Sequence, residues 1–293
     1  MALRINYNFE SVSAQRNLTG TQSSFFKAIE QLSSGLRINK AADDAAGMAV
    51  SEKLKNQVRG LNQAQRNAQD GVSMLQIAEG ALNETHSVLA RMRELAVQSA
   101  NDTLTNSDRL HIQAEVNQLV AEVDRISVST QFNKASLLNG TSTTVAFTGL
   151  SLKLHIGPNN EPTTPDGSNE ITMSIMNAGA STLGVHVLTN LSGSTSITSQ
   201  GGANTAIKTL DDAIDNVSVV RGRIGAMQNR LQSTINSLGI AAENTGAANS
   251  RIRDADVAQA VSDMVKNQIL QQSTMAVLAQ ANQAPQMALQ LLK

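Results

Sequence analysis

The sequence predicts a mainly α-helical protein in which two long helical regions run antiparallel and a short β-rich segment lies between them. Residues 1–140 and 204–293 are rich in Ala, Gln and Asn and carry a sustained apolar repeat, whereas residues 141–203 are rich in Thr, Ser and Gly. Aromatic residues make up only 2% of the chain, and the small aliphatic side chains used instead let helices approach closely along a seam. We therefore expect a coiled-coil or helical-bundle rod with a small β-hairpin in the middle of the chain.

The apolar repeat in the long regions has the spacing of a helical bundle. Its steps of three and four residues average about 3.5 residues, which is the period of a coiled-coil seam. Three runs keep this period, within residues 50–96, 112–126 and 207–252, and Thr85 and Thr245 are the polar exceptions. At about 1.5 Å per residue, a run of about 50 residues spans about 75 Å, which is long for an ordinary domain. We expect three helices of one bundle.

Two short segments in the middle of the chain alternate apolar and polar residues as half-buried strands do. Residues 150–156 and 170–176 each place an apolar side chain at every second position. Residues 157–169 contain three of the four prolines, so we expect them to connect the strands into a hairpin that packs on the helices. The fourth proline is Pro285, and we expect none of the four to interrupt a long helix.

The two ends of the chain carry apolar stripes that a pair of helices cannot cover completely. These terminal stripes consist of Ile5, Val12, Leu18, Phe25, Ile29, Leu32 and Leu36 at the N-terminus and of Val257, Val261, Met264, Val265, Ile269, Met275 and Leu278 at the C-terminus. A two-helix hairpin shields little apolar area from water. We therefore expect the ends to order only when neighbouring copies of the chain supply the missing cover. The competing interpretation is a solvated stripe in a monomeric coiled coil.

The sequence contains no pattern typical of catalysis or of cofactor binding, so we expect no enzyme and no cofactor. The absence of cysteine excludes disulfides and thiolate chemistry. Histidines lie far apart, without the His-Glu-x-x-His spacing of a zinc site, at His86, His111, His155 and His186. Acidic pairs precede two helical segments, at Asp43 and Asp44 and at Asp254 and Asp256. We interpret them as helix N-caps rather than as ligands of a cation.

Single glycines interrupt the helical repeat at a cost of up to about 1 kcal/mol each relative to alanine. They are Gly60, Gly71, Gly80, Gly222, Gly225 and Gly239. We interpret them as points of close helix contact.

The charge and hydropathy of the chain exclude other partners. The net charge is −1 and no polybasic cluster is present, so we expect no nucleic-acid binding. No run of 18 apolar residues could span a membrane, and the N-terminus lacks the apolar core of a secretory signal. If the protein leaves the cell, we expect a dedicated export route.

Several stretches of this sequence closely resemble bacterial flagellin. Residues 32–51 read LSSGLRINKAADDAAGMAVS, and further matches follow at residues 67–71, 78–82 and 91–101. The C-terminal region resembles the same family at NSRIRDADV (residues 249–257) and LAQANQAPQ (residues 278–286), before the final Leu-Leu-Lys. These regions of similarity cover about 230 residues in the order that the family has them.

The resemblance implies a subunit that polymerises with itself into the flagellar filament for swimming and is secreted to form an extracellular structure. Residues 1–42 with 254–293 would form an inner helical layer, and residues 43–140 with 204–253 an outer helical shell. Residues 141–203 are too few for a large projecting outer domain. Some flagellins carry a metallopeptidase in this region, and the missing His-Glu-x-x-His motif argues against one here.

The resemblance also implies partners. Flagellins pass through the flagellar export apparatus and assemble beneath a filament cap, above hook-junction proteins. An export chaperone would hold the segment from Val257 onward. In flagellins that the vertebrate flagellin-sensing Toll-like receptor recognises, the contact positions match Arg91, Leu95 and Glu115. The alternative for Leu95 and its neighbours is helix packing between subunits.

Three other functions remain as alternatives to a filament subunit. A hook-filament junction protein of the same superfamily resembles flagellin at its ends, but the nearly complete match of this chain favours the filament subunit. A chemoreceptor-like signalling coiled coil is disfavoured by the β-rich segment and by the lack of a membrane span. An enzyme is disfavoured by the absence of catalytic motifs.

Overall fold

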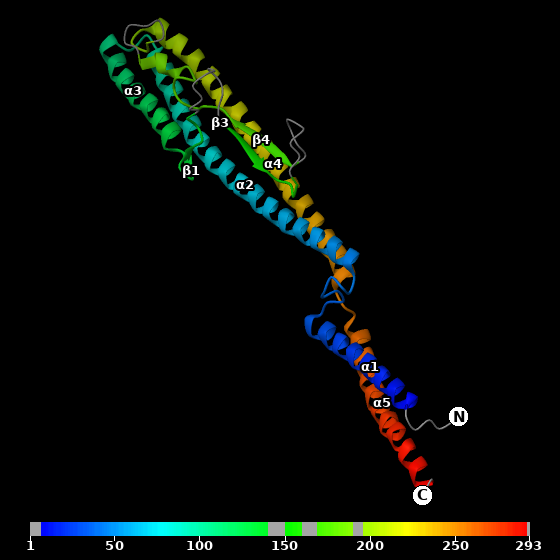
Figure 1. Ribbon diagram of the computed structural model, residues 1–293. Coiled ribbons are helices and arrows are strands. Elements are labelled where there is room, and N and C mark those ends of the chain that lie inside the picture. The colour runs from blue at the N-terminus through cyan, green and yellow to red at the C-terminus, as the bar shows by residue number, and fades with distance from the viewer. Residues whose placement is uncertain (1–6, 140–149, 160–168, 190–195, 292–293) are drawn as a thin grey trace. The chain divides into compact units, whose positions relative to one another are not determined.

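The computed structural model describes residues 7–139, 150–159, 169–189 and 196–291, and these residues are mainly helical (Figure 1). The helices are α1 (Phe9–Ser34), α2 (Ala45–Ser99), α3 (Asn106–Ser129), α4 (Gln200–Arg253) and α5 (Val257–Leu291). Strands β3 (Leu150–His155) and β4 (Glu170–Ile175) form an antiparallel hairpin, and β1 (Gln131–Phe132) and β2 (Ala135–Ser136) form a shorter one. A 3₁₀ helix, η1, covers Val185–Thr189. The predicted class, mainly α with a small central hairpin, is confirmed.

The chain forms two compact units. The first comprises Met1–Val58 with Glu243–Lys293, and the second comprises Arg59–Ala242. The division falls within α2 and α4, so each of these helices contributes to both units.

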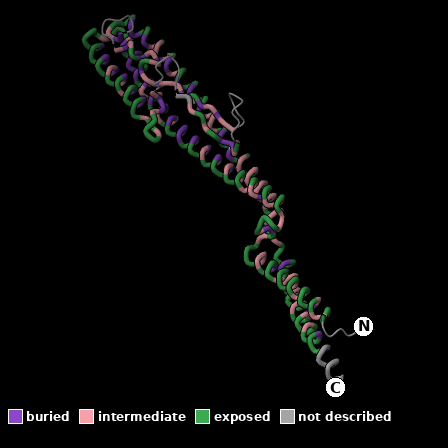
Figure 2. Tube along the Cα trace, viewed as in Figure 1, coloured by how far each residue is buried: buried purple, intermediate pink, exposed green. Residues whose placement is uncertain are grey.

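The core of the second unit is built from the helical repeat that the sequence predicts. Its fully buried side chains are mostly long and aliphatic, and they come from α2 (Leu75, Leu82, Leu89, Met92), α3 (Val116, Val123) and α4 (Leu210, Val217, Leu231). Figure 2 shows buried residues gathered between these helices. Complete burial of one such side chain stabilises the fold by about 1.5–3 kcal/mol. Three facing seams therefore give this unit a continuous core of its own.

The polar exception in the α2 seam is also buried. Thr85 is 1% exposed, and its hydroxyl donates a hydrogen bond to the carbonyl of Ala81 at 3.1 Å. A hydroxyl that is satisfied by its own helix can occupy a core position at low cost.

The β3–β4 hairpin packs on the helices through one face. Ile171, Met173 and Ile175 alternate along β4 and are buried in the core of the second unit, as their period of two predicts. The strands end one residue earlier than the predicted segments, at His155 and Ile175. Most of the predicted connection, residues 160–168, lies outside the described residues.

The glycines in the long helices do not have the role that we predicted. An added Cβ at Gly71 would collide with the side chain of Leu154 in β3, and one at Gly60 would lie 3.1 Å from Pro158. These two glycines therefore leave space for strand β3 and for Pro158, which follows it. At Gly80, Gly222, Gly225 and Gly239 no described atom lies within 4 Å of an added Cβ. The prediction of close helix contacts is wrong for these four positions within one chain.

Buried polar side chains fix the turn between α2 and α3. The guanidinium of Arg109 donates to the carbonyls of Ser99 and Asn101 at 2.9 and 3.0 Å, where the carbonyls at the end of α2 no longer have helical donors. Gln113 donates to the carbonyl of Leu188 at 2.6 Å and accepts from the amide of Ile197 at 3.0 Å. Gln113 thereby holds η1 and the approach to α4 against α3.

We expect the Leu82→Ala substitution to lower the free energy of unfolding of the second unit by about 2–5 kcal/mol, because it leaves a cavity at a fully buried position. The matched control is Leu110→Ala on α3, whose side chain is 48% exposed and whose loss should cost less than about 1 kcal/mol. Urea denaturation followed by circular dichroism measures both changes. Equal destabilisation by the two variants would contradict the assigned core.

Candidate self-assembly surfaces

Helices α1 and α5 form an antiparallel pair in the first unit. At one end of the pair, the side-chain amide of Asn8 donates to the carbonyl of Ala281 at 2.8 Å, and Ser11 donates to the side chain of Asn282 at 2.8 Å. At the other end, the amide of Ala255 donates to the carbonyl of Gly35 at 3.0 Å. Residues 273 positions apart in sequence thus fix the register of the pair.

The seam between α1 and α5 contains small side chains. In the parts of these two helices whose side chains the structure describes, the buried residues are Ala14, Ala28, Ala260 and Ala281. Alanine permits a close approach of two helices but removes little apolar area from water. The pair therefore lacks the layer of large buried side chains that stabilises the second unit.

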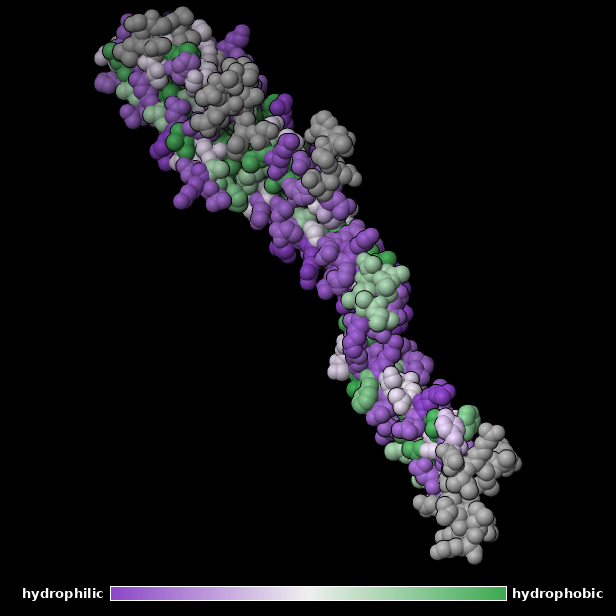
Figure 3. All heavy atoms as spheres, viewed as in Figure 1, coloured by the Kyte–Doolittle hydropathy of each residue, from purple (hydrophilic) through white to green (hydrophobic). Residues whose placement is uncertain are grey.

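The terminal stripes remain largely uncovered in one chain. Seven of the predicted packing residues are exposed, namely Val12, Ile29, Val257, Val261, Val265, Ile269 and Met275. Six are half-buried, namely Leu18, Phe25, Leu32, Leu36, Met264 and Leu278. Ile5 lies outside the described residues. Apolar side chains accordingly appear on the surface of this helix pair in Figure 3, and almost no buried residues appear there in Figure 2.

Further apolar residues of the terminal segments are exposed beside these packing residues. Tyr7, Phe9, Phe26, Leu270 and Val277 are all exposed. Phe26 and Leu270 belong to the apolar runs that the sequence predicts, whereas Tyr7, Phe9 and Val277 lie outside those runs. Apolar residues on more than one side of a helix are the signal that would have found them.

A short backbone bridge joins the α1–α2 connection to the α4–α5 connection, where α1 ends and α5 begins. Leu36 and Asp254 form an antiparallel bridge, and the amide of Arg37 donates to the carbonyl of Arg253 at 2.7 Å. Gly35 ends α1 in the left-handed conformation, with φ of 69°, which residues other than glycine seldom adopt. The α1–α2 and α4–α5 connections are thus held together within the first unit.

The predicted caps are confirmed for one aspartate of each pair. Asp44 accepts the amide of Gly47 at 2.8 Å at the start of α2, and Asp256 accepts the amides of Ala258 and Gln259 at the start of α5. Asp254 instead accepts from the hydroxyl of Ser250 at 2.6 Å. Asp43 also does not cap a helix.

Asp43 organises the α1–α2 connection. Its carboxylate accepts the amides of Asn39 and Lys40 at 3.2 and 3.1 Å and forms an ion pair with Lys27 of α1 at 2.7 Å. The hydrogen bond from Lys27, followed by the backbone amide of Lys40, lowers the pKa of Asp43 from 3.8 to about 2. The connection is therefore tied to α1 through a carboxylate that stays ionised in mildly acidic solution.

Pro285 lies inside α5, which continues to Leu291, so this proline does not interrupt the helix, in agreement with the sequence-based expectation. Proline has no amide hydrogen, and the carbonyl of residue 281 loses the donor that a helix would supply. Asn8 provides the replacement, because its side chain donates to this carbonyl while accepting the amide of Ser11 as the N-cap of α1.

The residues expected at a receptor contact do not share one surface. Arg91 and Glu115 are exposed and form an ion pair at 2.9 Å, and Arg91 also pairs with Glu94 at 3.1 Å. Leu95 is 2% exposed and belongs to the core of the second unit. Leu95 therefore packs inside its own chain, rather than at a subunit interface or at an exposed contact.

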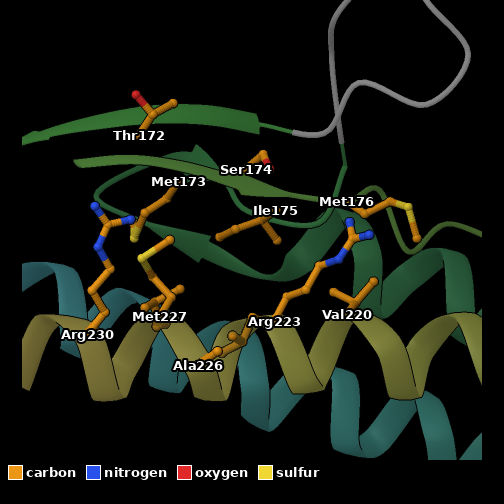
Figure 4. A pocket seen from close by; sticks show the side chains of 12 residues that line it. Thr172, Met173, Ser174, Ile175, Met176, Val220, Arg223, Ala226, Met227 and Arg230 are labelled. Atoms are coloured by element: carbon orange, nitrogen blue, oxygen red, sulfur yellow. The ribbon is translucent and has the colours of Figure 1, made fainter. Parts of the chain in front are cut away.

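A groove with mixed apolar and polar lining lies between β4 and α4 in the second unit (Figure 4). It encloses about 400 Å³, and Met173, Ile175 and Met227 line it with the arginines Arg223 and Arg230. In Figure 4 both arginines rise from α4 toward β4. No carboxylate, histidine or other acid–base group joins them in the lining, so this groove has no arrangement typical of a catalytic site.

Within the described ranges, no group of three or more His, Cys, Asp or Glu side chains could hold a metal ion. None of the helices in the described part of the chain has both the length and the apolar character needed to cross a membrane.

Two family models match most of the chain, including the helices that carry these surfaces. The model of the bacterial flagellin N-terminal helical region matches residues 5–143, and the model of the C-terminal helical region matches residues 207–292. The chain belongs to the bacterial flagellin family. The resemblance found in the sequence is thereby confirmed.

Individual relatives extend the match over the whole chain. This flagellin is 47% identical to the flagellar filament 33 kDa core protein of Treponema phagedenis, over 99% of each chain. It is 42% identical to the flagellin of Bacillus subtilis, over 99% of this chain and 100% of the relative. The match to both flagellin regions and to filament proteins along their full length does not favour the hook-filament junction alternative.

A solved structure shows the same fold. A protein of Vibrio parahaemolyticus described as a flagellar hook-associated protein superposes with a TM-score of 0.57, covering 72% of this flagellin and 100% of that chain. Its sequence identity is 18%, so the likeness concerns the fold alone.

We expect the titration of Asp43 to reveal its ion pair. The depressed pKa means that the carboxylate stabilises the connection fully above about pH 4, and that this contribution is lost as the pH falls toward 2. In the Lys27→Met variant the pKa should rise toward 3.8, because Lys27 is the largest cause of the shift. NMR titration of the Asp43 carboxyl carbon measures both values. Lys40→Met is the control, since its backbone amide still donates to Asp43.

Proposed function

We propose that this flagellin is a structural subunit that polymerises with copies of itself into the flagellar filament, and that α1 and α5 become fully covered only in the polymer. The sequence relatives include filament core proteins matched along their whole length. No catalytic arrangement was found among the described residues, and a structural role requires none. The proposal therefore names a protein that acts through its contacts with neighbouring copies.

One observation carries this proposal. Of the thirteen predicted packing residues that the structure describes, none is buried by the chain itself. Full burial of one such aliphatic side chain is worth about 1.5–3 kcal/mol. Partial burial of several of these residues by neighbours therefore contributes a free energy comparable to the total stability of an ordinary domain, which is about 5–15 kcal/mol. Contacts of this size make folding of the ends depend on assembly.

The layers of the filament are those that the family resemblance implies. We assign residues 1–42 and 254–293 to an inner helical layer, and the absence of a core of large side chains in this pair supports the assignment. Residues 43–140 and 204–253 then form the outer shell, whose helices are stabilised within each chain. The insert at residues 141–203 contributes a hairpin to this shell and no large outer domain.

The same exposed surface explains the partners that a flagellin needs before assembly. An unassembled α5 presents Val257, Val261 and Ile269 to water, and an export chaperone would shield the segment from Val257 onward during passage to the flagellar export apparatus. The filament cap and the hook-junction proteins would contact the terminal helices at the two ends of the polymer. Export would place the filament outside the cell.

Recognition by the vertebrate flagellin-sensing Toll-like receptor would use Arg91 and Glu115, which are exposed. Leu95 would act only by supporting α2 from the core. We expect Arg91→Ala to reduce receptor activation by the soluble chain without lowering its melting temperature, because exposed ion pairs contribute little stability. A reporter-cell assay measures activation. The control is Arg66→Ala, an exposed arginine elsewhere on α2. Equal loss in both variants would argue against this contact.

Seeded growth tests the proposed function directly. Purified chain mixed with short filament fragments should elongate into long uniform fibres, which negative-stain electron microscopy detects. A chain that never elongates on filament seeds under any solution condition would contradict the proposal.

We expect protease sensitivity to report the coupling of folding to assembly. In the dilute monomer, trypsin should cleave at Arg16, Lys27 and Lys266 in the terminal helices and spare Arg109, which is buried in the second unit. In fibres the same terminal sites should be protected. Mass spectrometry of the fragments identifies the sites, and termini that resist trypsin in the monomer would refute the coupling.

A further inference from the structure

Helix α5 turns a relatively polar face toward its partner α1. Because α1 is the described element that packs along α5, the covered residues of α5 mark the side that α1 occupies. These residues are the half-buried Asp263, Met264, Asn267, Gln271, Thr274 and Leu278 and the buried alanines Ala260 and Ala281, so only two large apolar side chains are among them. The larger apolar side chains of α5 are mostly on its other sides. The pairing of α1 with α5 thus leaves the more apolar surface of α5 without cover.

Apart from Met275, the large uncovered apolar residues of α5 form two separate flanks. The first flank consists of Val257, Val261, Val265 and Ile269, which are spaced four residues apart and make a continuous ridge. The second flank consists of Leu270 and Val277, spaced seven residues apart. At about 100° per residue, the centres of the flanks are roughly 150° apart around the helix. One neighbouring helix cannot contact both flanks.

A polar strip separates the flanks on the side of α5 away from α1. Ser262, Lys266, Ser273 and Gln280 share this side, and all are exposed. Going around the helix, the order is therefore the α1 contact, the first flank, the polar strip and the second flank. The polar strip is suited to water, whereas each flank is suited to another apolar surface.

We infer that the first flank of one copy packs against the second flank of the next copy, so that α5 helices contact one another in series. This inference rests on the proposed function and names the contact that the terminal helices make in it. The ridge of the first flank is suited to enter a groove on a facing helix, and Leu270 and Val277 border such a groove. Both surfaces occur on every copy, so each contact leaves one flank free for the next.

The composition of the flanks favours a second copy over other occupants. Between Val257 and Val277 the charged residues are only Asp263 and Lys266. This near-neutral surface offers no complement to a nucleic acid or to charged lipid headgroups. A contact between two different surfaces of identical chains is heterologous, and it produces an open assembly when its rotation does not close a ring.

The two flanks lie at different positions along the axis of α5, so two copies that pack through them must be shifted relative to each other. The centres of the two flanks are about ten residues apart, so parallel copies must shift by roughly 15 Å along the helix for the flanks to meet. A contact that combines rotation about an axis with a shift along it generates a screw. The arrangement on α5 is therefore sufficient to specify a helical polymer rather than a flat ring.

Cysteine cross-linking tests the contact without background, because the chain contains no cysteine. Val261→Cys or Val265→Cys would be mixed with isotope-labelled Leu270→Cys or Val277→Cys, grown on seeds and oxidised. We expect disulfides between labelled and unlabelled chains in the fibres and none in the dilute monomer. Disulfides that form only between identical flanks, or none in any of the four mixtures, would overturn the inference.

A second measurement uses trace amounts of each variant diluted into wild-type chain, so that assembly does not depend on the substitution. Maleimide labelling of Val265→Cys and Val277→Cys should slow by on the order of tenfold or more in fibres, because both flanks become covered. The control is Ser273→Cys on the polar strip, which should label at nearly the monomer rate. Full reactivity of either flank in fibres would overturn the contact. Failure of wild-type chain to elongate would instead refute the proposed function, and with it this contact.

Discussion

The structure depends on how much apolar area the helices can cover for one another. In the second unit, three helices and a hairpin bring large aliphatic side chains together, and Leu82, Leu89 and Leu210 are completely buried. In the first unit, α1 and α5 meet through alanines, and their larger apolar residues are half-buried or exposed. Both units use similar helical sequence, but only the second encloses a core. In the proposed function, the first obtains its cover from other copies of the chain.

This difference explains why a chain would keep so many exposed apolar residues. Exposed apolar surface promotes nonspecific association, which a monomeric protein avoids. In a polymer the same surface is the interface, and its distribution on α5 determines which neighbours can bind. The bridge between Leu36 and Asp254 and the carboxylate of Asp43 hold the two connections beside this helix pair. Local polar contacts thus position an apolar surface that the chain alone cannot bury.

Much of the fold could be predicted from local pattern. The 3.5-residue period located the three long helices, the period of two located β3 and β4 to within a residue, and the aspartates before two helices identified Asp44 and Asp256 as caps. Contacts between distant residues could not be predicted in this way. The burial of Leu95 depends on α2 being surrounded by neighbours on more than one side, and Gly71 faces a strand more than 80 residues away. A single period places Leu270 in the same run as the first flank of α5 and misses Val277, because it cannot represent apolar residues on opposite sides of a helix.

The hydrogen bond between Asn8 and Ala281 makes the two terminal helices depend on each other. Asn8 both starts α1 and satisfies the carbonyl of Ala281, which Pro285 leaves without a helical donor, so the first turn of α1 and the end of α5 share one side chain. A chain clipped before Ala281 therefore leaves the side-chain amide of Asn8 without this acceptor, although nothing has been removed from α1. Loss of Asn8 in turn leaves the Ala281 carbonyl of α5 without this donor.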